Sequence, residues 1–220
     1  MLRKYNKLGI FIVFIMFLFC CKSKQEHSFF VQQSKTIISP STDNLSVEEI
    51  NLLQNGDIIL RHGRGVISLG ISAQLNEEYK LSHCGIINIE NDSINIIHTL
   101  SASVSLADGM QKASLEEFIF DTYKNSIIIV RLKNNDNNKI ATKAKYYLSK
   151  KIPFDNDFDF ADTTTFFCSE LVFRILADEC NTNLIDINTT KDKAHNLRFG
   201  KFLDTTKFDI IINHQKKTEF

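Results

Sequence analysis

The sequence is poor in cysteine and carries no excess charge of either sign. Its five cysteines are too few for a disulfide scaffold in a chain of 220 residues. Its 26 basic and 26 acidic residues balance, no long run of one sign occurs, and no internal repeat is present. The composition therefore gives no indication of nucleic acid as a partner.

The sequence also lacks an apolar run of the length that crosses a membrane as a helix. The run at residues 8–19 has twelve residues, whereas a spanning helix needs about 17 to 25. Three basic residues precede this run, and Cys20 and Cys21 follow it, a pattern that resembles a bacterial lipoprotein signal. We expect cleavage before Cys21 and attachment of lipid to its thiol. An ordinary secretory signal and an uncleaved anchor are the alternatives.

The remaining chain is long enough for one domain, and its 43% apolar content excludes wholesale disorder. We expect a signal peptide at 1–20, a lipidated cysteine and polar tether at 21–46, a folded domain at 47–213 and a polar tail at 214–220. This organisation predicts a lipoprotein of the bacterial cell envelope, on the outer membrane and facing the periplasm or the surface.

Cys168 has the sequence context of a reactive thiol. Apolar or thiol side chains recur at helical spacing, at positions 168, 171, 172, 175 and 176, so Cys168 is expected in the first turn of a core-packed helix. The free N–H groups at a helix N-terminus favour thiolate over thiol and can also hold an oxyanion. The alternative is a buried structural cysteine on an apolar stripe.

Two histidines are predicted to share one face of a β-hairpin. Asn91-Asp92 has the composition of a two-residue turn, which pairs residue 89 with 94 and 87 with 96. In this register His83 and His98 lie on the same face with Gly85 between them, whereas Cys84 points the other way as a packed thiol. Each histidine could instead be a hydrogen-bonded core residue.

An acidic and aromatic loop precedes the cysteine helix. Asp155, Asp157 and Asp159 alternate with phenylalanines, but the glycine and glutamate that an EF-hand requires are missing, so calcium is not expected. We expect the aromatic rings to pack beneath the site and the carboxylates to line a substrate cleft. Glu170 is assigned to the same cleft and to ordering the start of the helix, without a catalytic role.

Further elements follow from periodicity and from cap or turn residues. Short helices are expected after Ser46 and at 115–120, the latter with a Ser114 and Glu117 capping box. Longer segments comprise a strand at 57–61, a helix at 66–75, a strand at 126–132, a helix at 140–151 and a strand at 208–212.

Three segments, 56–60 (GDIIL), 82–87 (SHCGII) and 167–172 (FCSELV), together resemble the permuted papain-like amidases, the YiiX-like branch of the cysteine hydrolases related to NlpC/P60. The resemblance covers about residues 50 to 180. It implies an α+β fold with a circularly permuted papain-like core, in which a cysteine-bearing helix packs on an antiparallel β-sheet. The histidine precedes the cysteine here, as the permuted order requires.

The resemblance also implies roles for the site residues. Cys168 would be the nucleophile, His83 the base that forms an ion pair with it, and His98 the group that orients the base. Many relatives have a carboxylate at the position of His98, so this residue departs from the pattern. No metal or organic cofactor is implied.

The expected function is therefore a cysteine hydrolase that cleaves amide bonds through a thioester. Its substrate would be an amide- or ester-containing small molecule or peptide, with peptidoglycan peptides as one candidate. A lipid acyltransferase or thioesterase of the lecithin:retinol acyltransferase-like type uses similar residues and is the first alternative. A non-catalytic binding lipoprotein and a zinc site at His83, His98 and Cys168 are further alternatives; the zinc site lacks paired ligand spacing.

Overall fold

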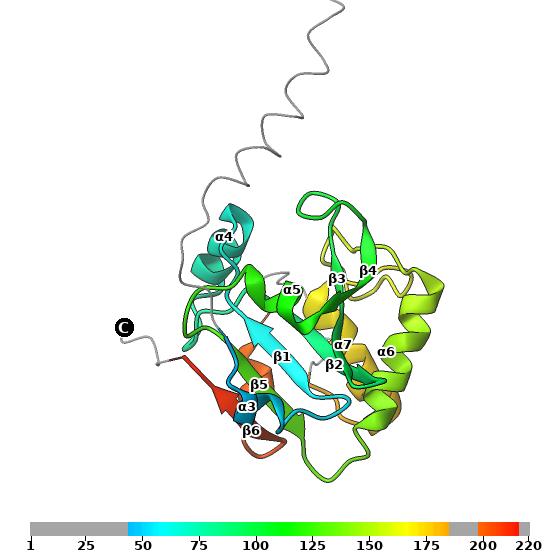
Figure 1. Cartoon of the computed structure of the whole chain (residues 1–220). Helices are drawn as coiled ribbons and strands as arrows, with labels where there is room; N and C mark the ends of the chain where they lie inside the picture. The colour runs from blue at the N-terminus through cyan, green and yellow to red at the C-terminus, as the bar shows by residue number, and fades with distance from the viewer. Residues whose placement is uncertain (1–43, 185–197, 216–220) are drawn as a thin grey trace, which may run out of the picture. The chain divides into compact units, whose positions relative to one another are not determined.

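A six-stranded antiparallel sheet, with strand order β4-β3-β2-β1-β5-β6, forms the centre of the structure (Figure 1). The structure is a computed structural model that describes residues 44–184 and 198–215, all within one compact unit. The strands are β1 (Ile58–Arg61), β2 (His83–Glu90), β3 (Ser93–Leu100), β4 (Gly109–Ser114), β5 (Ile128–Leu132) and β6 (Phe208–Asn213).

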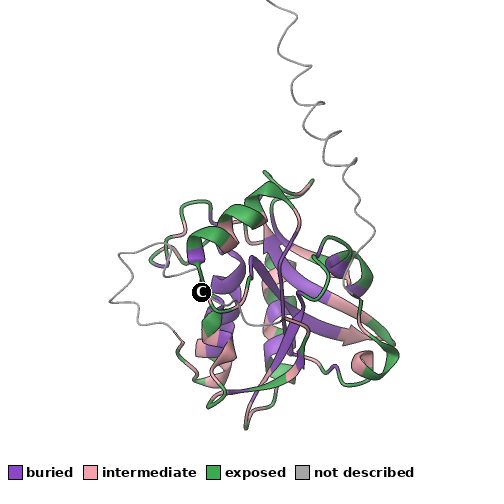
Figure 2. Ribbon diagram, turned by 90° about the vertical axis from the view of Figure 1, so that its left-hand side faces the viewer, coloured by how far each residue is buried: buried purple, intermediate pink, exposed green. Residues whose placement is uncertain are grey.

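Helices cover both faces of this sheet. The helices are α3 (Val47–Ile50), α4 (Val66–Leu75), α5 (Leu115–Phe120), α6 (Asn138–Lys150), α7 (Cys168–Cys180) and the 3-10 helix η2 (Gly200–Leu203). Helices α6 and α7 contact each other and pack on one face, where α7 buries Leu171 and Val172. Helix α5 packs on the other face through Phe118. Buried residues follow the strands and the inward sides of the helices (Figure 2).

The β2–β3 hairpin has the predicted register. Ile89 pairs with Ile94 and Ile87 with Ile96. Asn91 and Asp92 both have positive φ, at 49° and 60°, as a tight two-residue turn requires. Ladder pairing between the two strands runs only as far as Ile86 and Ile97. The first three residues of β2 therefore have no ladder partner in β3.

The start of β1 is locked to β5 by the Gly56-Asp57 segment. Gly56 has φ of +82°, and a Cβ there would lie 1.9 Å from the carbonyl oxygen of Asn137. The fully buried carboxylate of Asp57 accepts hydrogen bonds from Arg131 at 2.7 and 2.8 Å and from the backbone N–H of Gln54 at 2.8 Å. Residues 56 and 57, which belong to the 56–60 segment that carries part of the family resemblance, thus stabilise the fold.

The α+β architecture and the cysteine helix packed on an antiparallel sheet are confirmed. Strand β4 and helix η2 were not predicted. The expected signal peptide, most of the tether and the end of the tail lie outside the described residues, so the domain boundaries stay predictions. Within the described part of the chain, no helix has the length and apolar character needed to cross a membrane.

Candidate active site

Cys168 is the first residue of α7, as predicted, and only 6% of its surface is exposed. Extended backbone at Phe167 ends the preceding loop. The Glu170 carboxylate accepts the backbone N–H of Phe167 at 3.2 Å, which confirms that Glu170 orders the start of the helix. In this first turn the backbone N–H groups of Cys168 and Ser169 donate to the thiol sulfur.

Cys84 lies next to Cys168 in the structure. Because the Cys84 thiol donates to the sulfur of Cys168, and the backbone N–H groups of Ser169, Cys84 and Cys168 also donate to it, the pKa of the Cys168 thiol is lowered despite burial. Burial and the same contact raise the pKa of Cys84 well above its usual value. Cys84 thus stays protonated and stabilises a thiolate at Cys168.

His83 and His98 are brought together, as predicted. Nε2 of His83 and Nδ1 of His98 are 2.9 Å apart, and both side chains are buried. Both rings pack against Phe118 of α5, at centroid distances of 5.5 and 5.3 Å. Burial, followed by the nearby charge of Arg61, lowers the pKa of His83 well below its usual value and that of His98 to about 3. Both imidazoles are therefore neutral near pH 7.

The thiol and the histidines meet at one end of β2, but they approach it from opposite faces. Cys84 shares the α7 side with Cys168, whereas His83 and His98 face α5. Among the described residues no hydrogen bond links Cys168 to either imidazole. The expected resting ion pair between a thiolate and a His83 imidazolium is not favoured, because burial and Arg61 keep His83 neutral.

The carboxylate of Glu170 is buried rather than open to a cleft. It receives hydrogen bonds from Arg174, with the Nε contact at 2.7 Å, and forms an ion pair with this guanidinium. Burial raises the pKa of Glu170 to about 7, against the lowering effect of Arg174. Arg174 also binds the carbonyl oxygens of Phe160 and Asp162, so the pair fastens the acidic loop to α7. The assignment of Glu170 to a substrate cleft is thus wrong.

Asp155 is also buried and forms hydrogen bonds within its own loop. Its buried carboxylate accepts the backbone N–H groups of Asp157, Phe158 and Asp159 at 2.7 to 2.9 Å, which folds the loop around it. Asp155 therefore does not line a cleft. Asp157 and Asp159 are exposed, and their place in a substrate cleft stays a prediction. The predicted aromatic packing is confirmed, since the ring of Phe158 lies 5.4 Å from that of Phe167.

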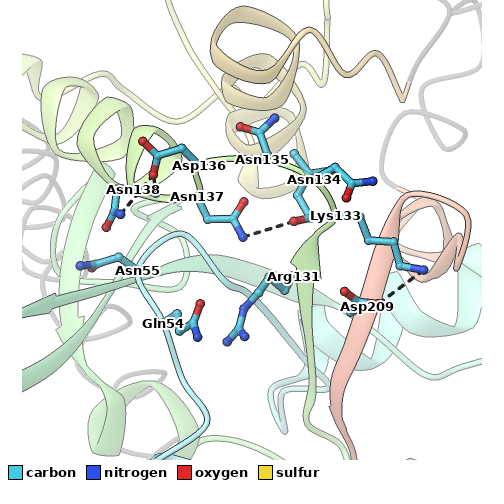
Figure 3. A pocket seen from close by; sticks show the side chains of 11 residues that line it. Gln54, Asn55, Arg131, Lys133, Asn134, Asn135, Asp136, Asn137, Asn138 and Asp209 are labelled. Atoms are coloured by element: carbon cyan, nitrogen blue, oxygen red, sulfur yellow. Dashed lines mark hydrogen bonds and ion pairs between the residues drawn. The ribbon is translucent and has the colours of Figure 1, made fainter.

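A polar pocket of about 560 Å³ lies away from these residues (Figure 3). It is lined by asparagines of the β5–α6 loop together with Arg131, Lys133 and Asp209. Asn55, at its edge, accepts the N–H of Ile89, six residues along β2 from His83. Six strand residues span roughly 20 Å, so this pocket is separate from the thiol and the histidines.

No group of three histidine, cysteine, aspartate or glutamate residues within 44–184 and 198–215 has the arrangement of a metal site. The zinc alternative at His83, His98 and Cys168 thus has no geometric support in this part of the chain.

Residues 52–206 match a family described as "Permuted papain-like amidase enzyme, YaeF/YiiX, C92 family". The chain belongs to this permuted papain-like amidase family. A search of curated proteins found no match. A similar solved structure is the "Crystal structure of metalloprotein yiiX from Escherichia coli O157:H7", with a TM-score of 0.55 and 18% identity, over 73% of this chain and 97% of that one. At this identity the likeness shows the shared fold.

Membership identifies the chain, at a coarse level, as an amide hydrolase of the permuted papain-like type. Two residues of the site were missed by the sequence interpretation. Cys84 was regarded only as packed, although its alternation away from His83 places it on the side of the cysteine helix. Arg61, at the end of β1, has no local sequence signal, because its place beside His83 depends on the pairing of β1 with β2.

Gly85 allows β3 to approach the start of β2. A Cβ at this position would lie 2.4 Å from Cγ2 of Ile96 and 3.2 Å from Cβ of His98. Gly85→Ala is therefore expected to lower the free energy of unfolding by about 1 to 3 kcal/mol, as overpacking does. Urea denaturation measures this change in the free energy of unfolding. Gly70→Ala, at a helical position with open space around it, is the control and should not destabilise. Equal effects of both changes would contradict the close packing.

The neutral His98 makes stability depend on pH. The unfolded chain binds a proton at His98 below about pH 6.5, whereas the folded chain does so only near its pKa of about 3. The free energy of unfolding is thus expected to fall as pH decreases through this window, by up to about 1.4 kcal/mol per unit. Urea denaturation of wild type and His98→Gln between pH 4.5 and 7.5 isolates this contribution. Parallel curves for the two proteins would contradict a neutral, buried His98.

Proposed function

We propose that the protein is a cysteine hydrolase that cleaves amide bonds through a thioester on Cys168. The observation that carries the proposal is the meeting of three features at one strand end. The first is the thiol of Cys168 at the start of a helix, whose pKa is lowered. The second is the backbone N–H of Cys84 in β2, which donates to this thiol. The third is the hydrogen-bonded pair of neutral imidazoles of His83, the residue before Cys84, and His98. Membership of an amidase family supports this reading.

In the proposed mechanism, His83 donates from Nε2 to Nδ1 of His98, which leaves Nδ1 of His83 free to accept a proton. The sulfur of Cys168 attacks the amide carbonyl while its proton passes to His83, and the first N–H groups of α7 hold the oxyanion. His83 then gives the proton to the leaving nitrogen, and the C–N bond breaks. Water, deprotonated by His83, attacks the thioester, and the proton returns to the sulfur.

The substrate class and location are part of the proposal. The exposed carboxylates of Asp157 and Asp159 suit a substrate with a positive charge, such as an amine-bearing peptide of the cell wall. Lipid on Cys21 would hold the enzyme at the membrane of a bacterial envelope. Cys21→Ser is then expected to move the protein from the membrane fraction to the soluble fraction, and an unchanged distribution would refute the anchor.

Incubation with matched amides and esters of acyl amino acids and short peptides tests the activity. We expect release of acid in an amount equal to the amine from an amide or to the alcohol from an ester, loss of this release in Cys168→Ala, and retention in Cys180→Ser, which changes the far end of the same helix. Hydrolysis that survives in Cys168→Ala would overturn the proposal.

The use of a second histidine in place of a carboxylate favours one competing activity, acyl transfer to a lipid acceptor. The same incubation with phosphatidylethanolamine vesicles separates the two. Acyl transfer to the lipid amine in preference to water would identify an acyltransferase.

A further inference from the structure

Two thiols lie in contact inside the fold, and only one of them reacts in the proposed mechanism. Cys84 and Cys168 belong to the same buried cluster on the α7 side of the sheet, and both are free cysteines. Cys84 is fully buried, whereas 6% of the surface of Cys168 is exposed. Cys84 is thus a second sulfur nucleophile beside the reacting one, and amide cleavage gives it no covalent step.

Two separate contacts hold the sulfur of Cys168 against Cys84. The Cys84 thiol donates a hydrogen bond to this sulfur, and the backbone N–H of Cys84 donates to it as well. The Cys168 sulfur is therefore within hydrogen-bonding range of both the backbone nitrogen and the side chain of one residue. A disulfide needs its two Cα atoms about 4.4 to 6.8 Å apart, and contacts of this kind bring two cysteines to such a separation.

Both cysteines stand on regular elements that pack together. Cys84 lies in β2, where its backbone pairs with Leu60 of β1. Cys168 begins α7, which packs on β2. Cys180, the third free cysteine in the described part of the chain, lies at the opposite end of α7, twelve residues along the helix and so about 18 Å away. Within the described residues, Cys84 is therefore the disulfide partner that Cys168 can reach.

We propose that Cys168 and Cys84 form a peroxide-reactive thiol pair, in which a hydroperoxide oxidises Cys168 and Cys84 then closes a disulfide with it. The chemical class of this second substrate is a hydroperoxide, ROOH, in which R is hydrogen or an organic group. The reaction goes beyond amide hydrolysis, because it involves no acyl group.

The first step uses the same sulfur as amide cleavage. The Cys168 thiolate attacks the terminal oxygen of the hydroperoxide, the O–O bond breaks, and the departing oxygen takes the proton that Cys168 released to become ROH. The sulfur loses two electrons, which reduce the peroxide, and becomes a sulfenic acid. The hydrogen bonds to the sulfur, which lower the pKa of Cys168, make thiolate available for this step.

Cys84 is the resolving thiol in the second step. Its sulfur attacks the sulfur of Cys168, the S–O bond breaks, and the hydroxide that leaves takes the Cys84 proton to form water. Two thiols and one hydroperoxide thus give one disulfide, one ROH and one water. Burial raises the pKa of Cys84, so this thiol stays protonated at rest and does not compete with Cys168 for the peroxide.

The disulfide has two consequences for the site. It consumes the nucleophile, so amide cleavage stops until a thiol reductant restores both cysteines. It also stops the oxidation of Cys168 before the sulfinic acid, which is irreversible under ordinary reduction.

Peptide-level mass spectrometry of the full chain, oxidised with a small excess of hydrogen peroxide and alkylated without reduction, tests the pair. In the wild type we expect a peptide in which a disulfide joins Cys84 to Cys168, and dithiothreitol should remove this disulfide. Cys180→Ser is the matched control and should give the same product. Cys168→Ser should leave the Cys84 thiol unoxidised under the same conditions.

Cys84→Ser removes the resolving thiol and keeps a hydrogen-bond donor at the same position. Dimedone, which traps sulfenic acids, is expected to label Cys168 roughly tenfold more in this variant than in the wild type. Prolonged peroxide should then convert Cys168 of the variant to a sulfinic acid that dithiothreitol does not reverse.

Three results in the wild type would overturn the pair: sulfinic acid at Cys168 with no disulfide to Cys84, a disulfide from Cys168 to any other cysteine, or no oxidation of Cys168. Equal dimedone labelling of wild type and Cys84→Ser would overturn it as well. If Cys84→Ser fails to fold, the wild-type peptides decide the question. The disulfide in a protein that cleaves no amide would uphold the pair and count against the proposed function alone, whereas amide cleavage without the disulfide would do the reverse.

Discussion

Replacement of Cys168 by serine is expected to lower kcat/KM for amide hydrolysis by about 10⁴-fold or more. A serine hydroxyl holds its proton far more tightly than a thiol, so the contacts from Cys84 and from the N–H groups of α7 cannot generate a comparable nucleophile. The substitution is nearly isosteric, so the melting temperature should stay close to that of the wild type. Steady-state kinetics on a cleaved amide, with thermal unfolding beside it, measure both.

Two other cysteines in the domain act as controls for this substitution. Cys180→Ser, at the C-terminal end of α7, should leave kcat/KM unchanged. Cys84→Ser retains a donor beside Cys168 and should reduce kcat/KM only modestly. The nucleophile assignment fails if Cys168→Ser keeps more than a tenth of wild-type activity.

Asp57→Ala is expected to lower the free energy of unfolding by about 3 to 5 kcal/mol. The change leaves the guanidinium of Arg131, whose side chain is mostly buried, without its carboxylate, and it removes the acceptor of the Gln54 N–H. The anchor between the start of β1 and β5 is then lost. Urea denaturation monitored by circular dichroism at pH 7 gives the free energy.

The matched control for Asp57→Ala is an ion pair of similar length at the surface. Lys145 and Glu90 are 2.9 Å apart, with more than 40% of each side chain exposed. Glu90→Gln should therefore cost no more than about 1 kcal/mol. If Asp57→Ala lowers the free energy of unfolding as little as Glu90→Gln does, burial of the Asp57–Arg131 pair does not increase its contribution to stability.

Local patterns predicted much of the fold. The hairpin register follows from Asn91-Asp92, because these residue types tolerate the positive φ that the tight turn needs. The capping box of Ser114 and Glu117 marked the start of α5. Strand β4 was missed because its sequence is polar and forms a strand only through pairing with β3.

The site was less predictable, because its chemistry depends on contacts between distant elements. The contact between the His83 and His98 rings depends on a single hairpin, so it could be predicted. The contact of Cys84 with Cys168 and the place of Arg61 depend on how α7 and β1 dock on β2. The burial of Asp155 and Glu170 arises from loop and helix contacts that residue spacing does not specify.

Intact-protein mass spectrometry of a reaction with an activated ester, quenched in acid, tests the central claim most directly. The account predicts an adduct with the mass of the acyl group on Cys168, short-lived in the wild type and persistent in His83→Ala, which lacks the base that activates water. No adduct should form in Cys168→Ala. Ester hydrolysis by the wild type with no adduct on Cys168, or with an adduct on another residue, would contradict the account.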